Sequence, residues 1–152
     1  MNITLNKYSF TIVLFFILLN CGDEKNTKNE TDNSNENEKF DLSNKGIGPI
    51  KSVNLSEKID PKMVAKGMEI YNTKCSACHK IDKKYIGAPL KGILKRRSPE
   101  WVMNMILNPE EMLTKDTIGK QLLIEYMGAP MAIQNLNEKD ARYILEYLRT
   151  LD

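Results

Sequence analysis

Histidine and cysteine are scarce in this chain, which has 1 His and 3 Cys among 152 residues. A structural zinc site needs four ligands, commonly from two Cys or His clusters, so zinc would have to recruit a carboxylate here. The chain also lacks a large excess of positive or negative charge. The 22 Lys and Arg against 20 Asp and Glu leave a net charge of +2, and that excludes the broad positive field of nucleic-acid binding. The length allows one domain.

Long apolar runs are also missing, and the N-terminal run at residues 10–19 is too short for the roughly 20 residues that span a bilayer. Its position is typical of a secretion signal. Cys21 follows Leu18-Leu19-Asn20, an ending that resembles the lipobox of bacterial lipoproteins, in which the cysteine carries lipid. We therefore expect a signal peptide over 1–20, a lipid anchor at Cys21, and attachment to a membrane of the bacterial cell envelope, facing the periplasm.

The segment after Cys21 has no apolar side chain from Gly22 to Lys39, so it cannot bury anything and is expected to be a disordered tether. The anchor and tether together span 21–39. The folded domain then covers 40–152, with an extended lead-in over 40–59 and a helical core over 60–152. No alternating run of β-branched residues follows Val53, so the domain is predicted to be all-α.

Proline and capping residues mark the expected helices. Asp60-Pro61 begins one over about 61–74, and Ser98-Pro99 begins another that stops at Asn108-Pro109. Asn108 caps a short turn through Met112. A further helix is expected over about 116–126, and the last opens at Asn137 with Asp140 as a capping box.

Cys75-Ser76-Ala77-Cys78-His79 closes the first expected helix. A thioredoxin-type pair belongs in a βαβ context that this sequence lacks, whereas a zinc site and a bare disulfide remain open alternatives. The pattern C-x-x-C-H is the signal for covalent attachment of c-type haem. In that chemistry each thiol adds across one porphyrin vinyl group and the histidine ligates the iron. Export, a single histidine and an all-helical domain favour the haem.

On these residues the sequence resembles the class I cytochromes c over nearly all of 60–152. Residues 67–71 are similar to the family's N-terminal helix, where a glycine permits a close crossing and an aromatic, here Tyr71, packs near the haem. Residues 86–92 resemble the family's Gly-Pro-x-Leu-x-Gly loop with Ala88 inserted. Residues 144–149 resemble its aromatic C-terminal helix, with Tyr147 as the aromatic between the helices.

The resemblance implies a small fold of about four to five short helices around one covalently attached haem c. It implies that Cys75 and Cys78 hold the porphyrin and that His79 is one axial ligand of the iron. The carbonyl of Pro89 would accept the proton of the free nitrogen of His79, fixing the ring. Trp101 is expected in the core or in the wall of the haem pocket.

Because the chain has one histidine, methionine must supply the other axial bond if the iron is six-coordinate. The family carries this methionine in a loop before the last helix, beside a proline. Pro130-Met131 resembles that arrangement, so Met131 is the predicted ligand, while Met127, Met112 and an open site remain alternatives.

The expected function is electron transfer without bond chemistry, between redox partners such as a terminal oxidase or a nitrogen-oxide reductase. The alternative is a haem sensor or peroxidase-like protein with an open distal site. A group of basic residues follows the haem motif and is either a solvated face or a rim that steers the domain to an acidic partner. Its members are Lys80, Lys83, Lys84, Lys91, Lys95, Arg96 and Arg97.

Overall fold

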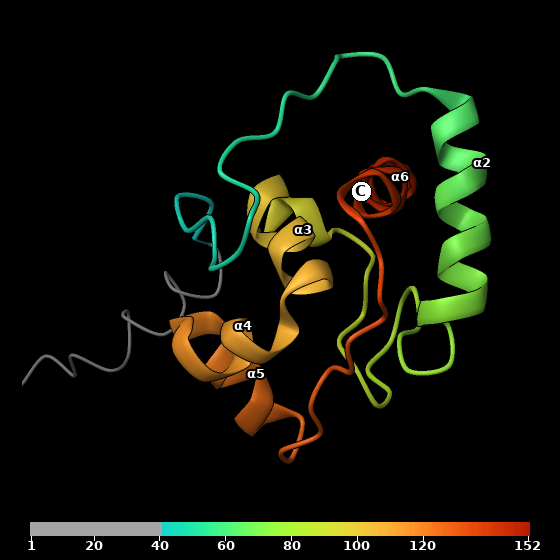
Figure 1. The fold of residues 1–152 in the computed structure, drawn as a ribbon. Helices are drawn as coiled ribbons and strands as arrows, with labels where there is room; N and C mark the ends of the chain where they lie inside the picture. The colour runs from blue at the N-terminus through green and yellow to red at the C-terminus, as the bar shows by residue number, and fades with distance from the viewer. Residues whose placement is uncertain (1–40) are drawn as a thin grey trace, which may run out of the picture. The chain divides into compact units, whose positions relative to one another are not determined.

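A computed structural model of the chain describes residues 41–152 (Figure 1). The predicted signal peptide, the anchor at Cys21 and the tether lie outside the described residues, so those predictions are not tested. Five α-helices and no strand occur in the described part, which confirms the all-α prediction. Between residues 41 and 152, none of the helices is both long and apolar enough to cross a membrane.

The helices begin where capping residues and prolines predicted. The side chain of Asp60 accepts from the Lys62 N–H at 2.8 Å, that of Ser98 from the Trp101 N–H at 3.1 Å, and Asn137 and Asp140 form a reciprocal capping box. The helices are α2 (Pro61–Ile70), α3 (Pro99–Leu107), α4 (Pro109–Lys115), α5 (Thr117–Glu125) and α6 (Glu138–Arg149).

Two short elements were not predicted as such. The end of the first helix widens into a π-helical turn, η1 (Tyr71–Cys75), and a 3₁₀ turn, η2 (Ile93–Lys95), precedes α3. The π turn ends at Cys75, the first cysteine of the C-x-x-C-H motif. Such turns inside helices are frequent at functional sites.

Helix α2 packs across α6, the most extensive contact between elements in the described residues. In Figure 1, α2 is seen along its length while α6 is seen almost end-on, so the two axes cross steeply. An ideal Cβ placed on Gly67 would lie 2.0 Å from the Tyr143 carbonyl oxygen and 2.9 Å from Tyr147 Cβ. The glycine therefore permits the close crossing, as predicted.

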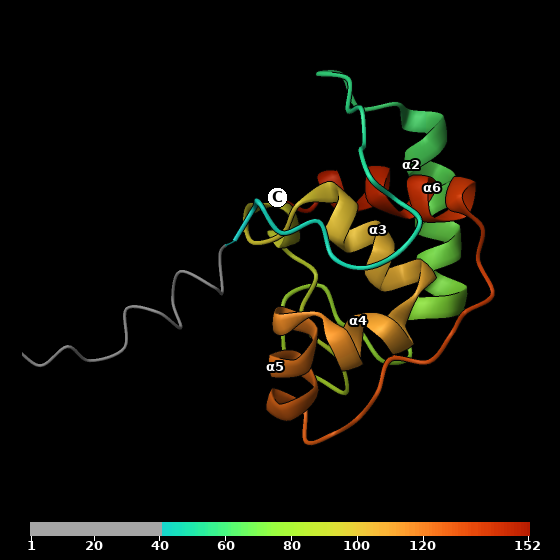
Figure 2. The ribbon, with the colours of Figure 1, turned by 60° about the vertical axis from the view of Figure 1, so that its left-hand side comes forward.

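The core lies between α3 and α6. Ile144 and Leu145 of α6 and Val102 of α3 are almost fully buried, and α3 also contacts α4, which packs against α5 (Figure 2). On α5 (Thr117–Glu125), Ile118 is buried and Leu122 is half-buried, and Tyr126, which caps the end of the helix, is buried too.

The lead-in is extended, as expected, but it is bound to the helices rather than lying loosely over them. Asn104 is 0% exposed, and its amide accepts from the Ile50 N–H at 2.9 Å and donates to the carbonyls of Lys45 and Ile50. Ile50 itself belongs to the core. The lead-in is thus an integral layer of the domain.

Candidate haem site

The two cysteines of the motif lie beyond α2: Cys75 is the last residue of η1, and Cys78 lies in the tight turn that follows. The N–H groups of Cys78 and His79 both donate to the Cys75 carbonyl, at 3.1 and 2.9 Å, so the turn brings both thiols and the histidine to one end of α2. Cys75 is half-buried and Cys78 is exposed, and both are free thiols. Burial, followed by the nearby Cys78, raises the pKa of the Cys75 thiol to about 11.

These features disfavour the two alternatives to haem. Among residues 41–152, no group of three or more His, Cys, Asp or Glu side chains is placed to hold a metal ion. The free state of both cysteines gives no support to a disulfide either.

The imidazole of His79 is held on several sides. Its Nδ1 lies 2.8 Å from the Ala88 carbonyl oxygen. A carbonyl can only accept, so Nδ1 is the donor in this hydrogen bond, and the tautomer with its proton on Nδ1 has its lone pair on Nε2. An ideal Cβ on Gly87 would lie 2.5–2.8 Å from three ring atoms, so the ring rests against a backbone that only glycine provides. The Tyr71 hydroxyl donates to the His79 carbonyl at 2.9 Å.

The prediction that Pro89 supplies the acceptor for His79 is wrong by one residue. Ala88 stands between glycine and proline, so the carbonyl facing His79 is that of Ala88. The Pro89 carbonyl accepts instead from Arg96 Nη2 at 3.1 Å. The inserted residue shifts the register of the loop while the hydrogen bond to the histidine is retained.

The chain's own residues fit a haem. The proton on Nδ1 leaves Nε2 available as a metal ligand, and a carbonyl on the opposite nitrogen is the usual partner of a ligating histidine. Both thiols lie within four residues of that histidine along the chain. Cys75, Cys78 and His79 would thus hold the porphyrin and its iron.

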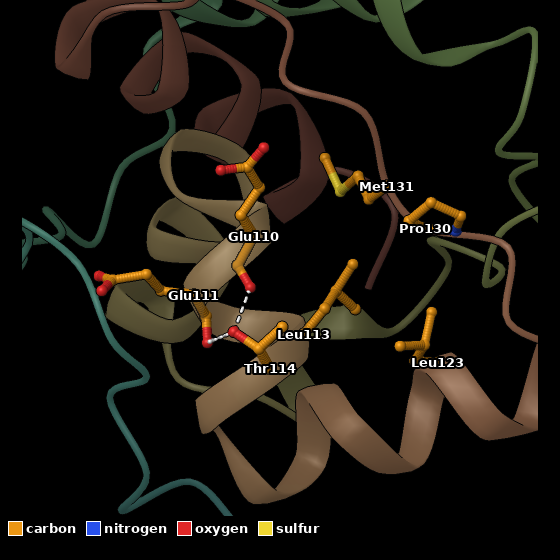
Figure 3. A pocket seen from close by; sticks show the side chains of 7 residues that line it. All are labelled: Glu110, Glu111, Leu113, Thr114, Leu123, Pro130 and Met131. Carbon is orange, nitrogen blue, oxygen red and sulfur yellow. Dashed lines mark hydrogen bonds between the residues drawn. The ribbon is translucent and has the colours of Figure 1, made fainter.

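The three candidate methionines differ sharply in their surroundings. Met131 is half-buried, packs against the core, and lines a pocket with Pro130, Leu113 and Leu123 (Figure 3). Met127 is 96% exposed. Met112 is 0% exposed, and its sulfur lies 3.0 Å from the Ile47 N–H, which donates to it. These surroundings favour Met131 over both alternatives.

Trp101 is a core residue, only 3% exposed. Its Nε1 donates to Asp116 Oδ1 at 3.0 Å, and the Arg97 guanidinium lies 5.3 Å from the ring centroid. Sequence analysis missed Asp116, whose buried carboxylate also accepts from Asn44 and from the Gly119 N–H. Contact of Trp101 with the haem remains a prediction.

The basic group does not form one uniform face. Arg97 is buried at 6% exposure and Arg96 is half-buried. The Lys84 ammonium donates to the Glu125 carbonyl at 3.0 Å and lies 4.3 Å from the Tyr126 ring centroid. Lys83, Lys91 and Lys95 are exposed, as is Lys84 in part, so the solvent-facing charge comes from lysines.

The helical fold, with a C-x-x-C-H motif whose histidine is oriented by a loop carbonyl, defines a domain built around covalently attached haem c. The family model for cytochrome c matches residues 64–152, more than half of the chain. The chain belongs to the cytochrome c family, so it carries one covalently bound haem c and acts in haem-based electron transfer. Domains of this family typically lie outside the cytoplasm.

Solved structures agree with the family. The chain is 44% identical to cytochrome c from Rhodothermus marinus, with a TM-score of 0.66 over 68% of this chain and 89% of that one. An engineered cytochrome c from the same organism is 43% identical, with a TM-score of 0.66, over 68% of this chain and 90% of that one. Another structure of that engineered protein, bound to a carbene intermediate, is 43% identical with a TM-score of 0.63, over 68% and 89%. The comparison with curated proteins found no match.

Proposed function

We propose that this protein is an electron carrier whose haem iron is ligated by His79 and Met131, tethered to a membrane of the cell envelope through lipid on Cys21. It moves single electrons between redox proteins such as a terminal oxidase or a nitrogen-oxide reductase. The observation that carries the proposal is the hydrogen bond of 2.8 Å between His79 Nδ1 and the Ala88 carbonyl, because it directs the lone pair of Nε2 to a metal.

The haem, when bound, supplies an iron that cycles between the ferrous and ferric states. The protein's residues fix the surroundings of that iron. Ala88 and Gly87 hold the imidazole in one orientation and Tyr71 holds the backbone of His79, so the ring need not reorient when the charge on the iron changes. A thioether ligand from Met131 favours the ferrous state and raises the potential.

The ligand proposal is tested by replacing Met131 with alanine in the haem-loaded protein, with Met127→Ala as the matched control. Met131→Ala should abolish the methionine-to-iron charge-transfer band at the red end of the spectrum and let the ferrous protein bind carbon monoxide readily. Met127→Ala should leave both properties unchanged, since its side chain is 96% exposed. Ready binding of carbon monoxide by the unaltered protein would instead support a haem sensor or a peroxidase-like protein.

The tether proposal depends on Cys21, outside the described residues. In a bacterial host, Cys21→Ser should move the haem-stained protein from the membrane fraction to the soluble fraction. Its absorption spectrum should stay unchanged, because the residues that hold the haem lie in the domain. Recovery of the variant in the membrane fraction would argue against a lipid anchor.

The partner proposal depends on the exposed lysines. If Lys83, Lys91 and Lys95 steer the domain to an acidic partner, the bimolecular rate of electron transfer should fall steeply as ionic strength rises. A triple Lys→Gln variant at these positions should lose most of that dependence. A flat profile in the unaltered protein would mean that the lysines only keep the domain soluble.

A further inference from the structure

Arg96 makes contacts with the loop that orients the histidine. The residue follows η2 directly and is half-buried. Its Nη1 donates to the Lys91 carbonyl at 2.9 Å and its Nη2 donates to the Pro89 carbonyl at 3.1 Å. A single planar guanidinium therefore binds two carbonyls of the segment that begins one residue after Ala88.

The loop depends on this contact because its backbone pairing is interrupted at that place. The Gly87 N–H donates to the Cys78 carbonyl at 2.9 Å, and further along, the Leu90 N–H donates to the Lys80 carbonyl at 3.2 Å. Between these bonds stands Pro89, which has no N–H to donate. The span that carries the acceptor for His79 is thus held at the Pro89 carbonyl by a side chain.

We propose that Arg96 is a positioning residue that sets the donor strength of His79, and through it the reduction potential, by aligning the Ala88 carbonyl with Nδ1. The inference rests on the ligation of iron by His79 in the proposed function. A well-aligned carbonyl on Nδ1 makes the imidazole more basic, and a more basic ligand favours ferric iron. Loss of the alignment therefore raises the potential.

The charge of Arg96 acts in the opposite direction. A nearby positive charge disfavours the ferric state, so removing a cation lowers the potential. The positioning effect and the charge effect of the guanidinium can therefore be separated by the sign of the change in reduction potential. Lysine at this position keeps the charge but lacks the planar fork that binds two carbonyls.

The experiment compares three haem-loaded variants with the unaltered protein: Arg96→Lys, Arg96→Gln and Lys95→Gln. Lys95 is the matched control, because it is exposed, adjacent in the chain and carries the same charge. The measurements are the midpoint potential and, by NMR, the hydrogen exchange of the His79 Nδ1–H. Circular dichroism and the methionine charge-transfer band report whether each variant keeps its fold.

Arg96→Lys should raise the midpoint potential and speed exchange of the Nδ1–H about tenfold, the effect of weakening roughly one hydrogen bond. Lys95→Gln should lower the potential slightly and leave exchange unchanged. Arg96→Gln should show faster exchange and a potential above that of Lys95→Gln.

The proposal is overturned if Arg96→Lys matches the unaltered protein in both measurements, or if Arg96→Gln behaves as Lys95→Gln does. If Arg96→Gln does not fold, Arg96→Lys alone decides. Failure of the proposed function is recognised separately: the unaltered protein would then lack iron-shifted resonances of the His79 ring.

Discussion

Tyr71 links the haem motif to the crossing of the first and last helices. Its hydroxyl donates to the His79 carbonyl at 2.9 Å, while its ring centroid lies 5.4 Å from that of Tyr147 on α6. Burial of the side chain, followed by the neighbouring Tyr147, raises its pKa, so the hydroxyl stays a donor at neutral pH. One side chain thus secures both the helix pair and the backbone of His79, the proposed iron ligand.

Tyr71→Phe removes only this hydroxyl and should lower the free energy of unfolding by about 1 kcal/mol, the net value of one hydrogen bond. Denaturant unfolding of the haem-loaded protein measures the change. Tyr85→Phe is the control, because the Tyr85 side chain is 54% exposed, and it should cost less than about 0.5 kcal/mol. Equal effects of the two substitutions would contradict the role assigned to Tyr71.

The sequence predicted the part of the site whose residues are adjacent in the chain. Cys75, Cys78 and His79 follow from a spacing that covalent attachment requires. Ala88 did not, because an inserted residue leaves two successive carbonyls as candidates and only the folded loop decides between them. Asn104 was missed because its partners lie 54 and 59 residues away in the chain.

The crossing of α2 and α6 leaves no room for an added side-chain atom at its closest point. The backbone of Gly67 approaches Tyr143 so closely that no Cβ fits between the helices. Extra atoms at such a contact force the helices apart. The crossing also holds η1, and with it the haem motif, in place.

Gly67→Ala should therefore lower the free energy of unfolding by about 3 kcal/mol, at the upper end of overpacking costs. Gly128→Ala serves as the control. Gly128 has φ +75° with no atom within 4 Å of its ideal Cβ, so the substitution adds backbone strain of about 1 kcal/mol and no clash. Thermal and denaturant unfolding of both variants give the comparison. A smaller loss for Gly67→Ala than for Gly128→Ala would show that the crossing can widen freely.

Helix starts were predictable from local signals, since proline and capping residues act within a few positions of each end. The π turn was not, because a helix expected over 61–74 shows no sequence break at Tyr71. The binding of the lead-in was not predicted either. It depends on polar side chains of α3, and a composition rich in glycine and polar residues indicates only an extended backbone.

Over the whole molecule, one buried carboxylate joins the lead-in, α2 and α6. The Glu146 side chain is 1% exposed and pairs with Arg142 and Arg149, while the Asp60 N–H donates to it at 3.1 Å. Arg149 in turn donates to the Ser56 carbonyl at 2.6 Å. Burial alone would raise the pKa of Glu146, but the hydrogen bonds from Arg142 and Asp60 and the charges of both arginines lower it below its ordinary value.

A carboxyl with a lowered pKa in the folded state stabilises the fold above its unfolded-state pKa, about 4.3 for glutamate. This contribution should therefore be lost as the pH falls from about 5 through the lower folded-state value. Glu146→Gln should cost about 3 kcal/mol at pH 7, because two arginines lose their partner, and should flatten the acid side of the stability profile.

Urea unfolding of the haem-loaded protein between pH 7 and pH 3 measures both effects. The control is Glu69→Gln, an exposed position with the same change of charge. Parallel acid profiles for Glu146→Gln and the unaltered protein would show that other groups govern the loss of stability at low pH.

The hydrogen bonds of the lead-in affect how the domain responds to a pulling force at its N-terminal end. Asn44 is bonded to Asp116 and Ser98, Ile50 to Asn104, and the Val53 N–H to Glu100, all before the chain reaches α2. Tension applied at Asp41 must break these bonds in turn before it can pull on α2, which leads through η1 to the cysteines. Force transmitted through the chain before Asp41 would therefore be borne by the hydrogen bonds of the lead-in, and the C-x-x-C-H motif would be protected from it.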